Sequence, residues 1–281
     1  MRLLDVQQVC DRLFLIGESC MHDVDRDSGG NSSLFITNRG SVLVDTKLPE
    51  AGEALCATIA SITDVPVTVV INTHSHIDHT GNNHRFPDAT RIAHVNAALR
   101  MSQMEKLSRL GAASLPNKTY RDCLVIGSGE DRVELHYFGK GHTAGDSWVV
   151  FPGCGVVQTG EMFCWKGAML CDQESGGDCL AFPETLSNGV RSLDDVDIVI
   201  PAHSKLACWR ELEEYESFNT AWMAVVTDNY RLGRGVEDAV TAALATVDAY
   251  PGYERYGVRT ATTAIYGALQ ERHGSKLGEH P

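Results

Sequence analysis

The chain carries its densest group of metal-binding residue types between positions 74 and 79. His74, His76, Asp78 and His79 fall within these six positions, directly after the apolar run 67–71. Such a run predicts a buried strand, and the cluster would then leave the end of that strand in a loop. Imidazole nitrogen and carboxylate oxygen form the donor set expected for zinc, iron or manganese. The cluster therefore predicts a metalloenzyme.

Three further residues of the same kind stand at the ends of other predicted strands. His142 lies in a glycine-rich turn, Glu161 follows a glycine, and His203 follows Pro-Ala. Because metal-binding and catalytic residues commonly lie on loops that a rigid scaffold holds, we expect these three to converge on the first cluster. The other histidines lack this context, although His22 and His84 could reach a cleft from loops.

The elements that must position these residues mix strands with helices. Apolar runs predict two strands joined by a hairpin turn at 38–40, then a helix over 48–62 and the strand 67–71. Residues 96–110 predict a second helix, and residues 211–249 are helical in pattern. This mixture indicates an α/β protein with two mixed sheets packed together and helices outside them. Periodicity alone leaves an ordinary α/β sheet as the alternative.

The composition is that of a globular protein with an acidic balance. Of its 281 residues, 43% are hydrophobic and 22% are charged, and the formal net charge is −13. The length predicts one large domain over residues 1–210, with residues 211–281 as a C-terminal helical extension packed on it. No block of Lys and Arg occurs, so we expect no binding to nucleic acid.

The sequence also predicts a location. It shows no recognisable signal peptide and no apolar stretch long enough to span a membrane, so we expect no membrane partner. Its nine cysteines are an odd number and include no C-x-x-C pair. This usage favours a reducing compartment over a disulfide framework and predicts a cytoplasmic protein.

Taken in order, these motifs resemble those of the metallo-β-lactamase superfamily. The resemblance rests on H-x-H-x-D-H at 74–79, Gly-His-Thr-Ala-Gly-Asp at 141–146, Gly-Glu at 160–161 and Pro-Ala-His at 201–203. The strand that ends at Asp45 also resembles the early acidic strand of that family, and the likeness extends from about residue 12 to 205. It implies an αββα sandwich with a two-metal site along one edge, and it says little about the substrate.

The resemblance also implies how the ligands divide between two divalent ions, with zinc as the first expectation and iron or manganese as alternatives. Asp45 and Asp146 would orient ligand imidazoles or neighbouring loops from behind. The implied ligands are His74, His76 and His142 for one ion, Asp78, His79 and His203 for the other, and Glu161 as the bridge.

Glu161 departs from the family pattern, because most superfamily hydrolases of this type have Asp at the bridging position. The longer side chain resembles that of alkylsulfatases and of a few diiron oxygenases. We therefore keep an alkylsulfatase-like hydrolase and a diiron oxygenase or oxidoreductase as alternatives. A binding protein with a vestigial site is a third alternative, which the complete ligand set disfavours.

The leading expectation is a hydrolase in which metal-bound hydroxide cleaves an ester, thioester, lactone or amide bond of a small molecule. Two divalent ions would lower the pKa of bound water to about 7 and stabilise the developing oxyanion. Asp78 would orient the hydroxide or relay its proton, as the catalytic residue of the site.

Substrate contacts are expected from Trp165, which follows the bridging acid, and from Lys205, which could pair with an anionic group. Two apolar segments, 101–120 and 163–182, would form a wall beside the metals, although core packing is the simpler role for such residues. The C-terminal helical stretch could contribute to a homodimer interface.

Overall fold

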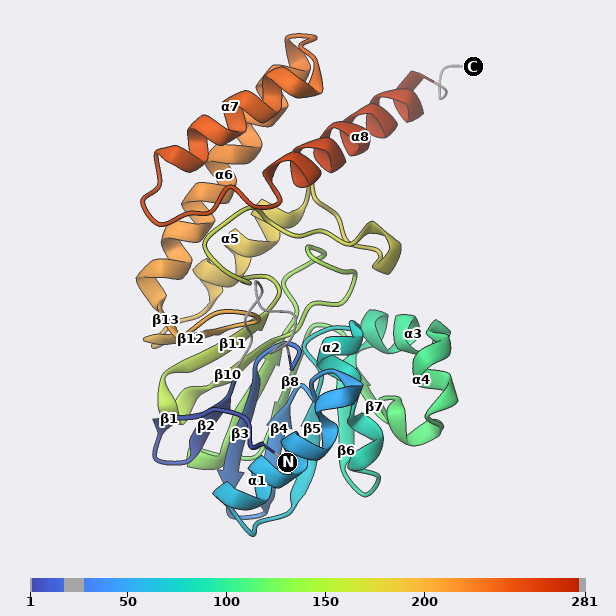
Figure 1. Cartoon of the computed structure of the whole chain (residues 1–281), viewed down its shortest axis with the longest axis vertical. Helices are drawn as coiled ribbons and strands as arrows, with labels where there is room; N and C mark the ends of the chain where they lie inside the picture. Colours follow the sequence, from blue (N-terminus) through green and yellow to red (C-terminus); the bar gives the residue numbers. More distant parts are fainter. Residues whose placement is uncertain (1, 18–27, 278–281) are drawn as a thin grey trace.

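The computed structural model describes residues 2–17 and 28–277 and builds two β-sheets packed face to face (Figure 1). Within those residues the first sheet has seven strands that follow one another in chain order. They are β1 (Val6–Cys10), β2 (Leu13–Ile16), β3 (Ser32–Thr37), β4 (Gly40–Val44), β5 (Val67–Ile71), β6 (Thr90–His94) and β7 (Lys118–Tyr120).

The second sheet has six strands in the described part of the chain, ordered β13-β12-β11-β10-β9-β8. Most neighbouring pairs are antiparallel, whereas β11 and β12 are parallel, so this sheet is mixed. The strands are β8 (Cys123–Ile126), β9 (Val133–His136), β10 (Trp148–Phe151), β11 (Val156–Gly160), β12 (Ile198–Pro201) and β13 (Ala207–Cys208).

Helices cover the outer faces of both sheets (Figure 1). The short α2, α3 and α4 lie beside the first sheet, and a long helical region extends from the second. The helices are α1 (Gly52–Ile62), α2 (Ile77–Thr80), α3 (Val95–Gln103), α4 (Glu105–Arg109), α5 (Phe182–Ser192), α6 (Trp209–Arg231), α7 (Val236–Asp248) and α8 (Val258–Leu277).

The hydrophobic core follows the alternation of side chains along the strands. In β10, Val149 and Phe151 face the layer between the sheets, whereas Trp148 and Val150 face α5 and α6. In β4, Leu43 packs outward against α1 while its neighbours point inward. Both faces of both sheets are therefore covered, and the predicted αββα sandwich with a C-terminal helical region is confirmed.

One predicted helix is wrong in its extent. The segment 96–110 is divided at Met104, whose extended backbone (φ −82°, ψ 113°) separates α3 from α4. Met101 and Leu107 are fully buried on either side of this break. The break lets both side chains point into the core. A straight helix would not place both of them there. The domain boundary at residue 210 stays a prediction, because the hydrophobic cluster around α5 and α6 continues across it.

The expectation that the cysteines stay reduced is wrong for one pair. Cys10, at the end of β1, forms a disulfide with Cys154 across 144 residues, with a Cα–Cα distance of 6.0 Å. This separation falls in the normal range for disulfides. Packing of the two sheets brings the pair together, so the spacing of the cysteines could not predict the disulfide.

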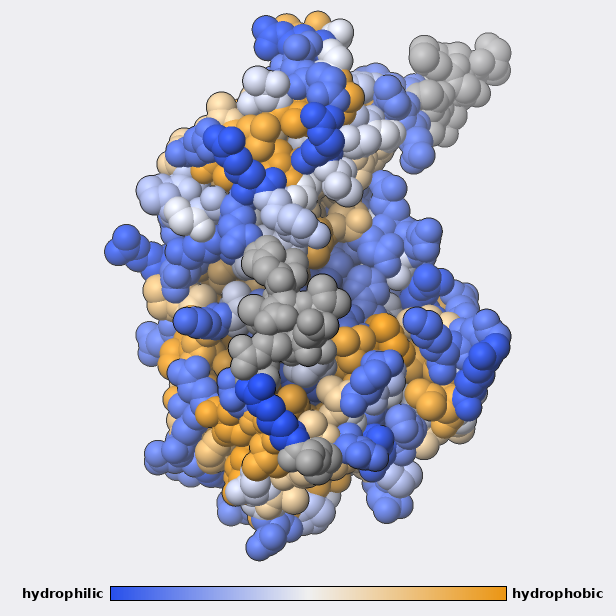
Figure 2. Space-filling model, viewed as in Figure 1, coloured by the Kyte–Doolittle hydropathy of each residue, from blue (hydrophilic) through white to orange (hydrophobic). Residues whose placement is uncertain are grey.

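The surface of the molecule is mainly hydrophilic on the face drawn in Figure 2, with hydrophobic residues gathered over the C-terminal helices and low on the sheets. Leu232, which follows α6, is 66% exposed.

Among the helices within residues 2–17 and 28–277, none is both long and apolar enough to cross a membrane.

Candidate metal centre

The loop between β5 and α2 presents the first ligand cluster at the edge of the sandwich. His76 is the N-cap residue of α2 and has extended backbone angles, so His74 and His76 lie outside the helix while His79 lies within it. The Thr80 hydroxyl donates to the His76 carbonyl (2.9 Å), and the Asn72 amide donates to the His79 carbonyl (3.2 Å). These bonds fix the loop that follows the strand.

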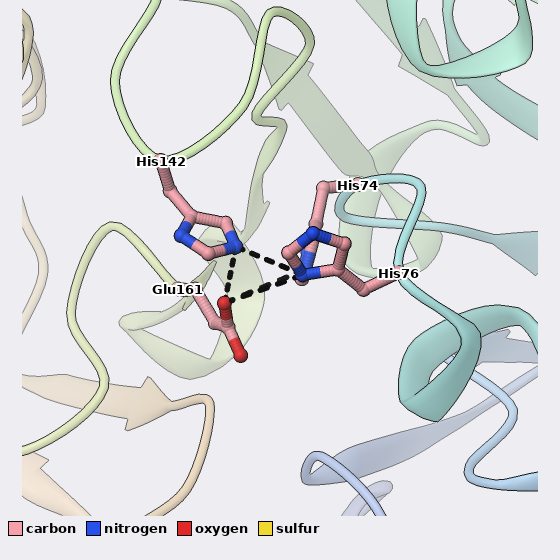
Figure 3. A group of neighbouring side chains, drawn as sticks. All are labelled: His74, His76, His142 and Glu161. Carbon is pink, nitrogen blue, oxygen red and sulfur yellow. Dashed lines mark hydrogen bonds and ion pairs between the residues drawn. The ribbon is translucent and has the colours of Figure 1, made fainter. Parts of the chain in front are cut away.

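A first group of four side chains brings residues from three parts of the chain together: His74, His76, His142 and Glu161 (Figure 3). Their ligand-type atoms all lie within 4.8 Å of one another. Glu161 Oε2 lies 3.8 Å from His74 Nε2 and 3.6 Å from His76 Nδ1, and it contacts His142 Nε2. The three imidazoles therefore converge on one carboxylate oxygen.

A second group lies on the other side of the same carboxylate and consists of Asp78, His79, Glu161 and His203. Glu161 Oε1 lies 2.8 Å from His203 Nε2 and 3.9 Å from His79 Nε2. Asp78 Oδ2 lies 3.3 Å from each of these two imidazole nitrogens. The structure thus brings together all seven residues nominated as ligands, in the two groups expected for two ions; metal ligation itself stays a prediction.

Gly160 sets the position of the bridging residue Glu161. Its φ is +54°, which glycine adopts without strain, and a Cβ there would lie 2.8 Å from Thr73 Cβ. The strand end can therefore pass close against the first ligand loop. The carboxylate of Glu161, 7% exposed, then reaches both groups at once.

The residues present fit divalent metal ions on two independent grounds. Atoms held about 2.1 Å from a tetrahedral ion lie about 3.4 Å from one another, which is close to the separations in both groups. In addition, His74 Nε2 and His79 Nε2 are buried without a hydrogen-bond partner and point into the groups. A buried imidazole nitrogen without a partner is costly, and a metal ion would satisfy it.

Asp45 orients two of the imidazoles from behind. It is fully buried and accepts from His79 Nδ1 (2.7 Å) and from the Thr73 hydroxyl (2.8 Å). Because that hydroxyl donates to Asp45, it is free to accept from His74 Nδ1, 3.0 Å away. One carboxylate thus fixes His79 directly and His74 through Thr73, leaving both Nε2 atoms facing the site. Thr73 was not predicted.

Asp172 and Leu170 play the same part for the other two imidazoles of the first group, and neither role was predicted. Asp172 Oδ2 accepts from His76 Nε2 (2.8 Å), so Nδ1 of that ring faces Glu161. The Leu170 carbonyl accepts from His142 Nδ1 (3.2 Å). Every imidazole of the first group therefore has its second nitrogen held by the protein.

The remaining predicted residues have diverse surroundings. Asp146 accepts from the backbone N–H and hydroxyl of Thr143 (2.6–3.1 Å), so it holds the loop after His142 and touches no ligand imidazole. His84 belongs to neither metal group. His22 lies outside the described residues.

The two predicted substrate contacts differ in their accessibility. Trp165 is 8% exposed and packs with Cys164 and Ala202, so it is a core residue. Lys205 is exposed two positions after His203. Contact of either residue with a substrate stays a prediction. Lys166, by contrast, is held in an ion pair with Glu211 (2.9 Å).

The electrostatics of the two groups show how strongly they hold positive charge. Burial is the largest single effect at His76 and lowers its pKa, but hydrogen bonds to Glu161 and Asp172 outweigh burial and raise the pKa to about 9. At His203 burial also lowers the pKa, and contacts with Asp78 and Glu161 raise it to about 8. Burial would raise the pKa of Glu161, yet the facing imidazoles hold it well below its usual range. Protons and metal ions therefore compete for the same positions.

A pH dependence of the metal-free protein follows from these pKa values. The folded-state pKa values of His76 and His203 lie above the ordinary 6.5, so their contribution to stability is full below pH 6.5 and is lost as the pH rises through about 8 to 9. We expect the melting temperature of chelator-treated protein to fall over this window. Metal-loaded protein should show no such fall, because ions replace the protons. A metal-free protein whose melting temperature is flat or rising from pH 6.5 to 9 would contradict this account.

Asp172→Asn is expected to weaken metal binding at the first group about tenfold. The carboxylate both accepts a hydrogen bond from His76 and stabilises positive charge on its ring, whereas an amide carries no charge. Titration with zinc against a competing chelator measures the change. Glu174→Gln, in the same loop but exposed and outside both groups, is the matched control. Equal affinities for the two variants would show that the Asp172 contact carries no weight.

The structure is an αββα sandwich of two sheets with histidines and carboxylates gathered at one edge, an arrangement suited to holding metal ions. The chain belongs to the metallo-β-lactamase superfamily: the sequence profile of that name, "Metallo-beta-lactamase superfamily", matches residues 25–222. The chain is therefore a member of this superfamily, as the sequence predicted.

Individual relatives give the same family. "Metallo-beta-lactamase domain-containing protein 1" of Rattus norvegicus is 30% identical over 186 residues, which cover 63% of this chain and 66% of the rat protein. The chain thus spans slightly less than two thirds of that relative. "Metallo-beta-lactamase IND-1" of Chryseobacterium indologenes is 26% identical over 186 residues, 64% of this chain and 74% of that protein.

Solved structures agree on the fold. The structure of a metallo-beta-lactamase from Pontibacter korlensis superposes with a TM-score of 0.66 at 20% identity and covers 77% of this chain and 99% of its own. At this identity the likeness concerns the fold alone. The part of this chain left uncovered shows that the sandwich carries additional structure here.

Proposed function

We propose that the protein is a binuclear, zinc-dependent hydrolase that cleaves an ester, thioester, lactone or amide bond of a small molecule. The observation that carries the proposal is the position of Glu161, which places Oε2 in one group of ligands and Oε1 in the other. A carboxylate between two groups of imidazoles suits a pair of ions better than a single ion. Two bound ions would supply activated water at neutral pH and an electrophile for the substrate carbonyl.

The protein's own residues would prepare the site for this reaction. The hydrogen bonds behind His74, His76, His79 and His142 hold their rings in fixed tautomers, so little reorganisation is needed when metal binds. Most residues of both groups are buried, which strengthens the electrostatic interactions among them. These features support preorganisation as the main contribution of the fold.

Asp78 is the group that we propose to handle the proton. Its side chain is 23% exposed, whereas the neighbouring His79 is fully buried, so solvent and substrate can reach this carboxylate. Burial would raise the pKa of Asp78, but His79 and His203 hold it well below its usual range. The carboxylate is therefore ionised at neutral pH and can orient a water molecule or accept its proton.

The class of substrate is inferred from the net charge of the protein, which argues against polyanionic partners. The net charge of −13 disfavours polyanionic nucleic acid, so a small molecule is the proposed partner. A homodimer through the C-terminal helices remains part of the proposal. A cytoplasmic location also remains part of the proposal. The Cys10–Cys154 disulfide counts against it, because disulfides are rare in reducing compartments.

One experiment tests the proposal most directly. Protein purified without added metal is analysed for metal content and by optical spectroscopy, and the zinc-loaded protein is then assayed on esters, thioesters, lactones, β-lactams, alkyl sulfates and phosphodiesters. Two zinc ions, no visible absorption and highest kcat/KM on a carboxylic derivative would support it. Bound iron with visible absorption would favour the oxygenase alternative, and an alkyl sulfate as best substrate would favour the sulfatase. A phosphodiester as best substrate would overturn the argument from charge.

A further inference from the structure

The segment from Leu170 to Cys179 lies directly behind two predicted ligand imidazoles. The Leu170 carbonyl holds His142 Nδ1, and Asp172 Oδ2 holds His76 Nε2. A displacement of this segment would therefore change the position of both rings. Whatever fixes the segment also fixes one side of the metal centre.

Backbone hydrogen bonds close the segment into a compact loop. The Asp172 N–H donates to the His142 carbonyl (2.8 Å), and the Asp178 N–H donates to the neighbouring Gly141 carbonyl (3.0 Å). Across the loop, the Gly177 N–H donates to the Asp172 carbonyl (2.8 Å). The two ends of the loop are thus held side by side, and a cysteine flanks each end.

Cys171 and Cys179 are the two flanking residues. Both line one cavity, and each thiol influences the pKa of the other. This interaction raises the pKa of the Cys171 thiol and lowers that of the Cys179 thiol, which favours Cys179 as the attacking sulfur. Neither residue belongs to a metal group, and the Cys10–Cys154 disulfide does not involve them. The pair has no part in the proposed hydrolysis.

A cavity of about 230 Å³ gives small molecules a route to both sulfurs. Cys171 and Cys179 line it together with Met169 and Leu170, and residues 256–264 at the start of α8 close its other side. Cys179 is only 2% exposed, so this cavity is its approach from solvent. The thiols are therefore reachable by a small reagent while they are shielded from another protein.

We propose that Cys171 and Cys179 form a reversible dithiol–disulfide site that low-molecular-weight disulfides oxidise and that locks the loop behind His76 and His142. Cys179 thiolate attacks one sulfur of a disulfide such as glutathione disulfide and releases one thiolate. Cys171, after losing its proton to solvent, then attacks the mixed disulfide and releases the second. Two electrons pass from the cysteine pair to the oxidant, which leaves as two thiols.

The test uses the full chain, metal-free and zinc-loaded, treated with glutathione disulfide. Wild type is compared with Cys171→Ser, Cys179→Ser and the control Cys123→Ser, which removes an exposed thiol elsewhere. Peptide mapping is expected to show a Cys171–Cys179 cross-link in wild type and the control alone. Cleavage after the exposed Glu174 by a glutamate-specific protease should slow in the same two proteins. In zinc-loaded protein, oxidation should slow transfer of metal to a chelator by up to about tenfold.

Each outcome decides the proposal. Absence of the cross-link, or a cross-link that leaves both proteolysis and metal transfer unchanged, would overturn it. The effect on metal transfer rests on the proposed function, whereas the cross-link and the proteolysis do not. Protein that binds no zinc but forms the cross-link and resists cleavage would therefore contradict the metal proposal and retain the thiol site.

Discussion

Glu161→Gln is expected to reduce bound metal from the two ions per chain that we propose to one or none, and to lower turnover by at least about 100-fold. The amide keeps the size of the side chain, but it removes the negative charge and replaces one oxygen by a nitrogen that donates. Because Oε2 serves the group of His142 and Oε1 serves the group of His203, either rotamer leaves one group without its shared acceptor. Metal analysis after reloading and exhaustive dialysis measures the loss.

Glu161→Asp is the matched variant, because it keeps the charge and shortens the side chain by one methylene. The backbone cannot follow the shortened chain easily, since Gly160 already lies against Thr73. We therefore expect Asp at this position to retain one ion firmly and the second weakly. Two firmly bound ions and full turnover in the Gln variant would contradict the bridging role. The same result in the Asp variant alone would show that the extra length is not needed.

The types of the ligand residues could be predicted from the sequence because few side chains bind first-row metals. His142, Glu161 and His203 each follow a strand, and sheets deliver the ends of their strands to a common edge. The contacts behind the ligands could not be predicted in the same way. Asp172 reaches His76 across 96 residues, and it comes from a loop whose acidic composition resembles that of any solvated loop.

The secondary-structure elements also differ in how well they could be predicted from the sequence. The central strand β5 was predicted residue for residue, because its apolar side chains form a continuous run. The edge strands β1 and β7 were not predicted, since most of their residues are exposed and polar side chains are tolerated there. The break at Met104 and the disulfide at Cys10 depend on how separate elements pack. No local pattern encodes that packing.

Asp45→Asn is expected to weaken both groups of ligands, by about 10- to 100-fold in metal affinity. Asp45 has a positive φ of 59°, and Asn is among the residues that adopt this conformation readily, so the backbone should be preserved. The change is then chiefly electronic. The amide can present its NH₂ to His79 Nδ1, which would favour the tautomer with hydrogen on Nε2 and so remove the lone pair that faces the site.

The Thr73→Val variant tests the indirect link from Asp45 to His74 separately from the direct contact of Asp45 with His79. The hydroxyl of Thr73 links Asp45 Oδ2 to His74 Nδ1, and valine has nearly the same shape without that link. We expect Thr73→Val to weaken only the group that contains His74, whereas Asp45→Asn weakens both. Stepwise zinc titration, with cobalt as a spectroscopic probe of each site, distinguishes the two patterns.

Asp45→Ala should differ from Asp45→Asn in stability as well as in metal binding. Alanine leaves the buried Thr73 N–H and His79 Nδ1 without an acceptor and tolerates the positive φ poorly. Loss of one partner of a buried charged pair costs about 3–5 kcal/mol, so the alanine variant is expected to melt well below the asparagine variant even without metal. Equal melting temperatures for the two, with metal affinity unchanged from wild type in both, would mean that neither the charge nor the hydrogen bonds of Asp45 organise the site.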